Sequence, residues 1–302
     1  NKRLVMQIYH NKCFIEPIKK IVAFNNTEFK NALSELEEYR QQDFYILGYI
    51  RYCAKDIFSG AVIASKLPLL YFEVYDNYID YIPYSPKKNV NIYSEPQISF
   101  EQYQDALTKI KQHIAKGDTY EVNYTYSYKV YTDADNLKLY NYLLAKQQTK
   151  YNTFIINDWE EVLSFSPELF FRVKNNKIMT KPMKGTVARG KNEQEDLANK
   201  EFLQQDIKNR AENVMIVDLL RNDLSKIAKT GTINVDKLFE IEAHPTVYQM
   251  TSKISAELKA NTTLYNIFAA IFPCGSITGA PKVSTMNIIC LLYTSDAADE
   301  ED

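Results

Sequence analysis

The chain has 302 residues, 45% of them hydrophobic, and its 36 basic and 38 acidic side chains leave a net charge of −2. This length allows a large buried core, and the charge balance gives no electrostatic support to binding of nucleic acid or an anionic membrane. Four cysteines without CxxC spacing and three histidines without a neighbouring nucleophile argue against a zinc site, a disulfide framework and triad hydrolysis. No stretch approaches 18 apolar residues and we find no export signal, so we expect a cytoplasmic enzyme acting on small molecules.

The first part of the chain predicts a β-rich region followed by one amphipathic helix. Aromatic and aliphatic residues at 43–50 and 67–75 are typical of strands, and the proline-bounded stretch 83–96 indicates a loop. A capping box begins at Ser99, and the apolar periodicity that follows predicts a helix ending at Gly117.

The middle of the chain predicts mostly antiparallel sheet. Residues 120–130 alternate apolar and polar side chains, which predicts one continuous strand. A helix is expected at 136–147, then strands at 151–157 and 161–166, and a hairpin turning at Asn175 and Asn176.

Later residues add helices to this sheet. Residues 195–227 are helical by composition, a strand pair extends from Gly231 to about 256, and another helix spans 262–271. Because strands and helices mix without regular βαβ alternation, we predict the α+β class, with large, mostly antiparallel sheets packed with helices.

The composition changes abruptly near the end of the sequence. Residues 290–302 (CLLYTSDAADEED) form a short acidic tail, which we expect to be disordered, and the change suggests that the native reading frame ended near Ile289. We therefore divide the chain into an N-terminal β-rich part at 1–96, a catalytic region at 97–289 and a non-native-looking tail at 290–302.

Four of the eight glycines lie in two short segments, 180–190 (TKPMKGTVARG) and 275–282 (GSITGAPK). A chain poor in glycine uses it where side chains would obstruct the backbone, so both segments are candidate site loops. Lys184, in the first, is a candidate nucleophile or anion ligand, although a surface turn explains it equally well. The second can direct backbone N–H groups at a carboxylate or phosphate, but it does not match the P-loop pattern.

Glu168 is the first of two carboxylates that could carry chemistry. It opens the predicted strand Glu168–Val173, where partial burial would let a carboxyl group donate a proton near neutrality. A salt bridge to Arg172 on the same strand face explains the position equally well.

Glu212 is the second carboxylate, and helical spacing aligns it with apolar residues such as Met215 and Leu219. An isolated buried charge is too costly to persist, so Glu212 should meet a cation, and Mg²⁺ suits a lone hard oxygen ligand. A salt bridge to Arg210 or Arg221 is the equally weighted alternative.

Five blocks of the sequence, in order, resemble motifs of the chorismate-utilising enzymes, and within them the aminodeoxychorismate synthase component I group. The blocks are GDTYEVN at 117–123, SFSPELF at 164–170, TKPMKGT at 180–186, NRAENVMIVDLLRND at 209–223 and FPCGSITGAPK at 272–282. The resemblance covers most of the chain from about Phe44. It implies the fold of anthranilate synthase component I and the amination of chorismate with ammonia to 4-amino-4-deoxychorismate, in para-aminobenzoate and folate biosynthesis.

The resemblance also implies a role for each candidate residue. Glu168 corresponds to the general acid that assists departure of the chorismate 4-hydroxyl, and Glu212 corresponds to a ligand of an essential Mg²⁺. Lys184 corresponds to a proposed nucleophile toward ring carbon 2, at a position where anthranilate synthases usually have alanine. The substrate contacts implied by the resemblance are Gly185, Thr186, Gly275 and Ser276.

One comparison with water-adding relatives and two departures from the family pattern bear on this interpretation. Glu121 stands where the water-adding isochorismate and salicylate synthases have a lysine base, which disfavours water addition. Gln249 stands where many relatives have a histidine, and it receives no role. The sequence stops soon after the GAPK motif, before the segment that holds the substrate carboxylates in relatives, so we expect a C-terminally truncated and inactive chain.

The resemblance implies partners as well as residues. Chorismate is the expected substrate, and the ammonia would come from a separate glutamine amidotransferase subunit, since no such domain fits in this length. We expect neither a nucleic acid nor a membrane as partner. Anthranilate synthase component I, or an inactive truncated remnant, is the alternative.

Overall fold

The computed structural model describes residues 6–86, 89–147 and 149–293, so residues 294–302 of the expected acidic tail lie outside it. The expected disorder is wrong for residues 290–293, which form the end of helix α8 (Lys282–Tyr293). The chain forms two compact units. The first unit is composed of Asn1–Ile92, Thr132–Glu168 and Ala260–Phe272. The second is composed of Tyr93–Tyr131, Leu169–Lys259 and Pro273–Asp302. The division at residues 96 and 289 stays a prediction about the sequence.

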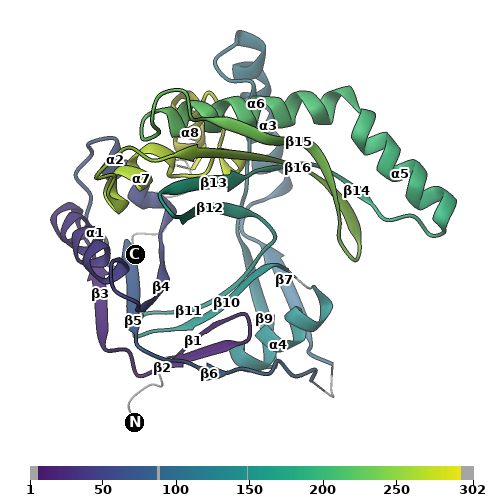
Figure 1. The fold of residues 1–302 in the computed structure, drawn as a ribbon. Coiled ribbons are helices and arrows are strands. Elements are labelled where there is room, and N and C mark those ends of the chain that lie inside the picture. Colours follow the sequence, from purple (N-terminus) through teal and green to yellow (C-terminus); the bar gives the residue numbers. More distant parts are fainter. Residues whose placement is uncertain (1–5, 87–88, 148, 294–302) are drawn as a thin grey trace. The chain divides into compact units, whose positions relative to one another are not determined.

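The first unit is built from two antiparallel sheets (Figure 1). One sheet has the strand order β11 (Glu161–Ser166), β10 (Tyr151–Ile156), β1 (Met6–Tyr9), β2 (Lys12–Ile15), β6 (Ile79–Asp80). The other has the order β3 (Lys19–Ala23), β5 (Leu70–Tyr75), β4 (Tyr45–Ile50). Its helical elements are α1 (Asn26–Arg40), η1 (Tyr52–Ala54), α2 (Lys55–Phe58), α4 (Asn136–Lys146) and α7 (Leu264–Ile271).

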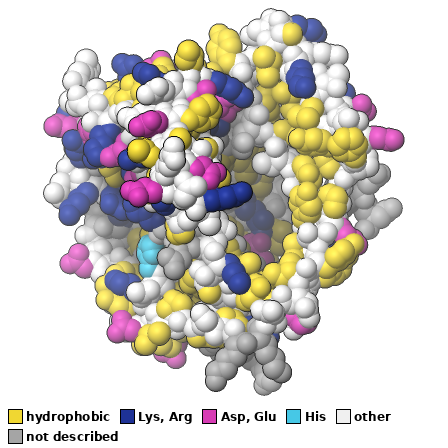
Figure 2. Space-filling view, turned by 90° about the vertical axis from the view of Figure 1, so that its right-hand side faces the viewer, with side chains coloured by type: hydrophobic (Ala, Val, Ile, Leu, Met, Phe, Trp, Pro, Cys, Tyr) yellow, Lys and Arg dark blue, Asp and Glu magenta, His cyan; other side chains and the backbone are white. Residues whose placement is uncertain are grey.

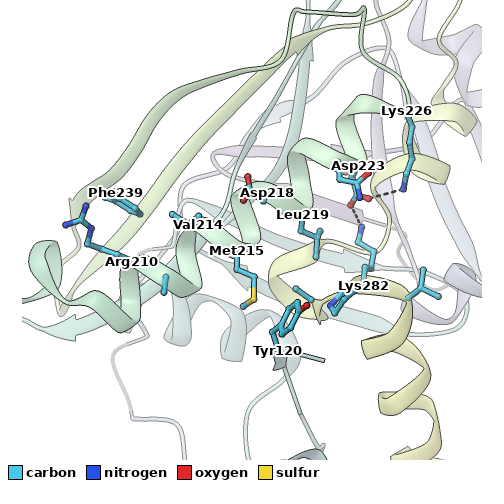
Figure 3. A pocket seen from close by; sticks show the side chains of 15 residues that line it. Tyr120, Arg210, Val214, Met215, Asp218, Leu219, Asp223, Lys226, Phe239 and Lys282 are labelled. Atoms are coloured by element: carbon cyan, nitrogen blue, oxygen red, sulfur yellow. Dashed lines mark hydrogen bonds and ion pairs between the residues drawn. The ribbon is translucent and has the colours of Figure 1, made fainter. Parts of the chain in front are cut away.

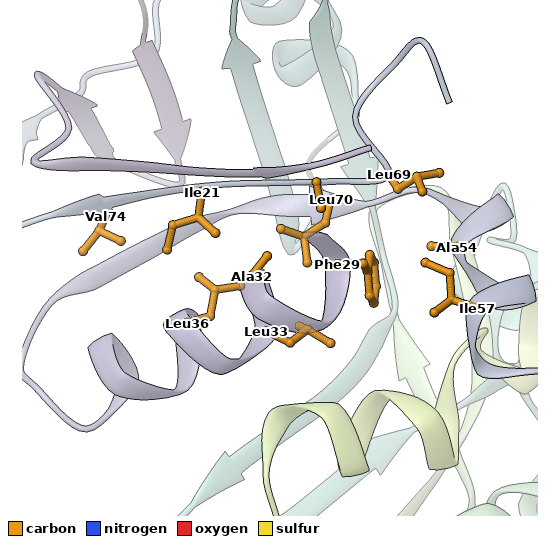
Figure 4. Packing of buried hydrophobic residues seen from close by; sticks show 11 residues of the cluster. Ile21, Phe29, Ala32, Leu33, Leu36, Ala54, Ile57, Leu69, Leu70 and Val74 are labelled. Carbon is orange, nitrogen blue, oxygen red and sulfur yellow. The ribbon is translucent and has the colours of Figure 1, made fainter. Parts of the chain in front are cut away.

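Helix α1 supplies much of the core of this unit (Figure 4). The side chain of Asn25 caps the helix by accepting a hydrogen bond from the Glu28 N–H, which satisfies one of the free donors of the first turn. Phe29, Leu33 and Leu36 recur at helical spacing and are buried in one cluster with residues of β3 and β5. Burying each such side chain contributes about 1.5–3 kcal/mol, so this helix face stabilises the unit strongly.

The second unit is organised by the long strand β16 (Val247–Glu257). Strand β15 (Asn234–Ala243) pairs along residues 248–255 of β16, so β13 (Lys177–Lys181) and β14 (Met183–Ala188) share the opposite edge. Strand β12 (Leu169–Lys174) continues the sheet beyond β13. Helices α5 (Glu193–Gln205) and α6 (Ile207–Ser225) pack against β14 and β16, with Leu203, Tyr248 and Met250 buried between them.

Two small sheets complete the second unit. Strand β8 (Glu121–Val122) pairs with β17 (Gly279–Ala280), and β7 (Ile92–Pro96) pairs with β9 (Tyr128–Thr132). The remaining elements are α3 (Phe100–Lys116), η2 (Gly275–Ile277) and α8 (Lys282–Tyr293). Antiparallel pairing predominates among the described strands, so the predicted α+β class with mostly antiparallel sheets is confirmed.

Most predicted elements are present, including the capping box at Ser99, the left-handed Gly117 that ends α3, and the hairpin at Asn175 and Asn176. The predicted strand at 120–130 is wrong, because its two ends pair with different partners and only β8 and β9 form. The other corrections are smaller. The expected loop at 83–96 ends in β7, the helical stretch 195–227 breaks at Asp206, which caps α6, and the strand opened by Glu168 begins at Leu169.

The visible surface is chemically mixed. On the face drawn in Figure 2, hydrophobic side chains are exposed among charged ones of both signs. Within the part of the chain that the structure describes, each helix is too short or too polar to cross a lipid bilayer.

Candidate active site

Lys184 lies in a bulge of strand β14, not in a surface turn. Met183 pairs with Thr251 and Thr186 with Gln249, so two residues of β14, Lys184 and Gly185, oppose one residue of β16. Gly185 has a φ of 94°, a conformation that glycine adopts without strain. A β-bulge changes the direction in which the side chains beside it point, and bulges are frequent beside active sites. The bulge that Gly185 allows therefore sets the direction of the Lys184 side chain.

The ammonium group of Lys184 forms an ion pair with Glu121 of β8. The pair is largely removed from solvent, since the lysine side chain is 14% exposed and the glutamate side chain 18%. Glu121 uses only Oε1 in this contact. Its Oε2 atom is buried and has no hydrogen-bond partner among the described residues, so it can accept a further donor.

Backbone pairing with the GAPK segment holds Glu121 in place. Glu121 pairs with Ala280, and the Tyr120 N–H donates to the Ala280 carbonyl at 2.8 Å. The buried hydroxyl of Thr119 lies 3.0 Å from that same carbonyl and 2.7 Å from the hydroxyl of Thr285. These contacts fix the backbone that presents Glu121 to Lys184.

The two predicted substrate-contact glycines pack against the same helix, α6. A Cβ atom on Gly185 would lie 3.0 Å from the Asn209 side chain, and one on Gly275 would lie 2.6 Å from Leu219. Asn209, Glu212 and Leu219 fall on one side of α6 by the 3.6-residue period. The helix therefore carries Glu212 between the points at which the two glycine segments pack.

Glu212 is half-buried, with 35% of its side chain exposed. Its neighbouring cation is Lys208, at 3.9 Å, rather than Arg210 or Arg221. The described residues contain no group of three or more His, Cys, Asp or Glu side chains able to hold a metal. One carboxylate still fits Mg²⁺ in part, because that ion commonly uses one or two protein carboxylates and completes its shell with water and substrate oxygens.

The other two predicted contacts differ in exposure. Ser276 is 7% exposed, and its hydroxyl is buried without a partner among the described residues. Thr186 is exposed on β14 and opposes Gln249, whose Oε1 atom is also buried without a partner in that part of the chain. Unpaired buried polar atoms are costly, so both Ser276 and Gln249 are suited to meet polar groups of a ligand.

Glu168 is the last residue of the first unit, directly before β12 of the second. The Ser166 hydroxyl lies 3.3 Å from both the N–H and the carbonyl oxygen of Glu168, so this short segment is locally braced. The side chain is half-buried and its Oε1 atom is removed from solvent.

A cavity of about 850 Å³ lies along another side of α6 (Figure 3). None of the seven predicted site residues lines it, but it borders the GAPK segment at Ala280 and Lys282. At one end Lys282 pairs with Asp223, which also accepts from Lys226 at 3.0 Å. Burial lowers the pKa of Lys282, and the charge of Asp223 opposes that shift.

Comparison with known proteins identifies the family to which this arrangement belongs. The profile of the chorismate binding enzymes matches residues 5–296. The chain belongs to the chorismate binding enzyme family. The Lys184 bulge, the Glu212 helix and the GAPK segment are therefore parts of a chorismate binding enzyme.

Two groups of curated relatives are similar to the chain. Aminodeoxychorismate synthase component 1 of Escherichia coli is 35% identical over 208 residues, which is 68% of this chain and 46% of the relative. Anthranilate synthase alpha subunit 1 of Arabidopsis thaliana is 35% identical over 192 residues, which is 64% of this chain and 32% of the relative. The chain thus spans less than half the length of these relatives. Because its sequence identity to both is 35%, identity does not show to which of the two groups the chain is more similar.

Solved structures show the same fold. Anthranilate synthase component I of Streptococcus pneumoniae superposes with a TM-score of 0.74 at 20% identity, covering 97% of this chain and 78% of that one. The predicted anthranilate synthase component I-like fold is therefore confirmed.

Sequence reasoning missed two ion pairs. It noted Glu121 only as the replacement for a lysine base, and it did not foresee the pair with Lys184, because the two residues lie 63 positions apart. It also gave no partner to Lys282. The one available signal was that both lysines sit in glycine segments of a chain with few glycines.

Proposed function

We propose that this protein aminates chorismate with ammonia to form 4-amino-4-deoxychorismate. The observation that carries the proposal is the placement of Lys184 in the Gly185 bulge, largely buried and aimed at a carboxylate instead of at solvent. A largely buried lysine adds little to solubility and is suited to act as a nucleophile. In the resemblance stated above, lysine at this position marks the aminodeoxychorismate synthases.

The proposed reaction proceeds in two displacements. The Lys184 amine forms a bond to ring carbon 2, the two ring double bonds each shift by one position, and the bond from carbon 4 to the hydroxyl breaks. Glu168 donates the proton with which the hydroxyl leaves as water. Ammonia then forms a bond to carbon 4, the double bonds shift back, and the bond between Lys184 and carbon 2 breaks. The new ammonium group at carbon 4 returns a proton to Glu168.

The remaining residues bind and orient the substrate. Gly185 and Gly275 let backbone approach the ring closely, while Thr186 and Ser276 offer hydroxyls to its polar groups. Glu212 would hold Mg²⁺, which when bound supplies a positive charge for a substrate carboxylate. Such positioning contributes much of the rate that a two-reactant step requires.

The ammonia would be supplied by a separate glutamine amidotransferase subunit, in para-aminobenzoate and folate biosynthesis within the cytoplasm. The relative from Escherichia coli named above supports this reaction for the family, though only part of its length is matched.

The competing activity is that of anthranilate synthase component I, favoured by the similarity to the Arabidopsis protein. It would release an aromatic product after amination at carbon 2, a step that needs no lysine at position 184. Incubation of the full-length protein with chorismate, Mg²⁺ and ammonium, followed by product identification, separates the two. The 4-amino compound is expected, and anthranilate as the main product would contradict the proposal.

A further inference from the structure

We propose that Glu121 is the proton acceptor of Lys184, taking the proton from Nζ before the amine attacks and returning it when the amine leaves. This inference rests on the proposed function, in which Lys184 is the nucleophile. It adds a second reacting group, on a different element of the second unit, to the residues already assigned.

The contact between the two side chains is the first argument. An ammonium has no free electron pair, so Lys184 cannot act as a nucleophile until its proton has moved to another group. Glu121 is the partner of its Nζ atom, and little of either side chain reaches water that could take the proton instead. The carboxylate is therefore the nearest acceptor.

The sparse bonding of Glu121 is the second argument. Asp196 shows the opposite case, since its carboxylate accepts two bonds from Arg189 at 2.7 Å, one from the Gly190 N–H and one from the Tyr248 hydroxyl. Those donors hold the pKa of Asp196 far below its usual value, and it stays a structural anion. The Glu121 carboxylate accepts from Lys184 alone among the described residues, so a proton on this carboxylate displaces a single donor.

Several charged groups near the pair have partners of their own. On elements packed against β14, Asp196 of α5 pairs with Arg189, Glu212 of α6 lies near Lys208, and Lys253 of β16 pairs with Asp236. On α8, next to β8, Lys282 pairs with Asp223. None of these pairs competes with Glu121 for the proton of Lys184.

The rigid support of both residues is the third argument. The bulge at Gly185 fixes one side, and pairing of β8 with β17 fixes the other. A group that exchanges a proton must stay within hydrogen-bond distance of its partner, which such supports provide.

The proton transfer balances without any further reactant. The ammonium and carboxylate become a neutral amine and a neutral carboxylic acid, and the charge of the pair stays at zero. The amine then bonds to carbon 2 as described above. When the carbon 2–nitrogen bond breaks, the nitrogen recovers its electron pair and takes the proton back from Glu121.

The first test reads the charge of Lys184 without any turnover. The 302-residue chain and Glu121→Gln are treated briefly with acetic anhydride at pH 8, and labelling of each lysine is measured by peptide mass spectrometry. Loss of the carboxylate removes the stabilisation of the ammonium, so labelling of Lys184 should rise at least threefold. Labelling of Lys181 of β13, which pairs with Glu242 of β15, is the internal control and should not change. Glu242→Gln should raise the labelling of Lys181 and leave that of Lys184 unchanged. Equal labelling of Lys184 in all three proteins would overturn the proposal.

The second test reads the proton acceptor itself. In the full-length protein, with chorismate and Mg²⁺ but no ammonium, attack by Lys184 should add the mass of chorismate less one water to the protein. The parent should form this adduct at a rate that hardly changes between pH 6.5 and 8.5, because its proton moves within the pair. Glu121→Gln should be slower at pH 6.5 and gain about tenfold per pH unit, because its proton must go to solvent.

Glu121→Asp keeps the carboxylate and should keep the flat profile, which separates lost chemistry from a damaged fold. A Glu121→Gln profile equal to that of the parent would overturn the role of Glu121 while leaving Lys184 as the nucleophile. Absence of the adduct from all proteins, with the labelling difference intact, would contradict the proposed function and leave Glu121 as the group that controls the charge of Lys184.

Discussion

Gly279 and Glu121 approach each other so closely that a Cβ atom on Gly279 would lie 2.0 Å from the Glu121 carbonyl oxygen. The glycine also has a φ of 141°, which residues with a side chain rarely adopt. The GAPK segment thus needs this glycine so that β17 can pair with β8 and present Glu121 to the site.

Gly279→Ala should therefore destabilise the protein by more than about 2 kcal/mol, since steric overlap adds to backbone strain. Gly231→Ala is a matched control, because Gly231 has a φ of 78° with open space around it. Backbone strain alone should lower the free energy of unfolding of that variant by only about 1–2 kcal/mol. Urea unfolding measures both free energies, and equal losses would show that the close approach is unimportant.

The cluster around Asp196 predicts how stability depends on pH. Hydrogen bonds from Arg189 and Tyr248 hold the folded-state pKa of Asp196 below its unfolded value of about 3.9. Its contribution should be fully present above about pH 5 and decline as the pH falls below 4 toward the folded pKa. Asp196→Asn should accordingly be less stable than the parent at pH 7, by a margin that narrows toward pH 3.

Unfolding free energies at several pH values check this margin. Asp218→Asn is the control, because Asp218 pairs with Arg221 at an exposed position on α6 and should matter little at any pH. A margin for Asp196→Asn that stays constant down to pH 3 would contradict the assigned cause.

The buried pair of Asp223 and Lys282 predicts a strong coupling. Their side chains are 6% and 11% exposed, so Asp223→Asn leaves a buried cation and should cost about 3–5 kcal/mol. Lys282→Met should cost less, because Asp223 keeps Lys226 as a partner. The double variant should be more stable than Asp223→Asn alone.

A double-mutant cycle in urea measures this coupling. Because burial lowers the pKa of Lys282 below its unfolded value, the deficit of Asp223→Asn should also shrink as the pH rises toward about 10. Additive effects of the two substitutions would mean that the pair contributes no mutual stabilisation.

Glu212 is expected to act on metal binding and not on stability. Glu212→Ala removes a half-exposed carboxylate whose only cation lies 3.9 Å away among the described residues, so unfolding should change by less than about 0.5 kcal/mol. The extra thermal stabilisation that Mg²⁺ gives in the presence of chorismate should disappear. Asp218→Ala, on the same helix, should retain it, and retention by both variants would remove Glu212 as a metal ligand.

Local signals in the sequence predicted most individual elements. The Ser99 capping box, the left-handed Gly117 and the paired asparagines of the β12–β13 turn act through neighbouring residues, and all three are present in the structure. The prediction of one strand at 120–130 failed, because alternation of polar and apolar residues shows only which face of a strand is polar. The partners of its two ends are set by distant residues at 92–96 and 279–280.

The site was predictable only in part for the same reason. Glycine usage correctly pointed to segments where side chains would collide, such as Gly185 against Asn209. The bulge that directs Lys184 depends on the register with β16, and the pair with Glu121 depends on β17 lying beside β8. Such contacts between distant segments leave no periodic signal in one sequence.

The most direct test of the central claim is made in the full-length protein and compares the products that the parent and Lys184→Ala form from chorismate, Mg²⁺ and ammonium. If Lys184 is the nucleophile at carbon 2, the parent should form 4-amino-4-deoxychorismate and the variant should lose that product by at least a hundredfold, which corresponds to about 2.7 kcal/mol of transition-state stabilisation. Lys181→Ala, which removes a lysine of the adjacent strand, should keep the product. Undiminished formation of the 4-amino compound by Lys184→Ala would contradict the account.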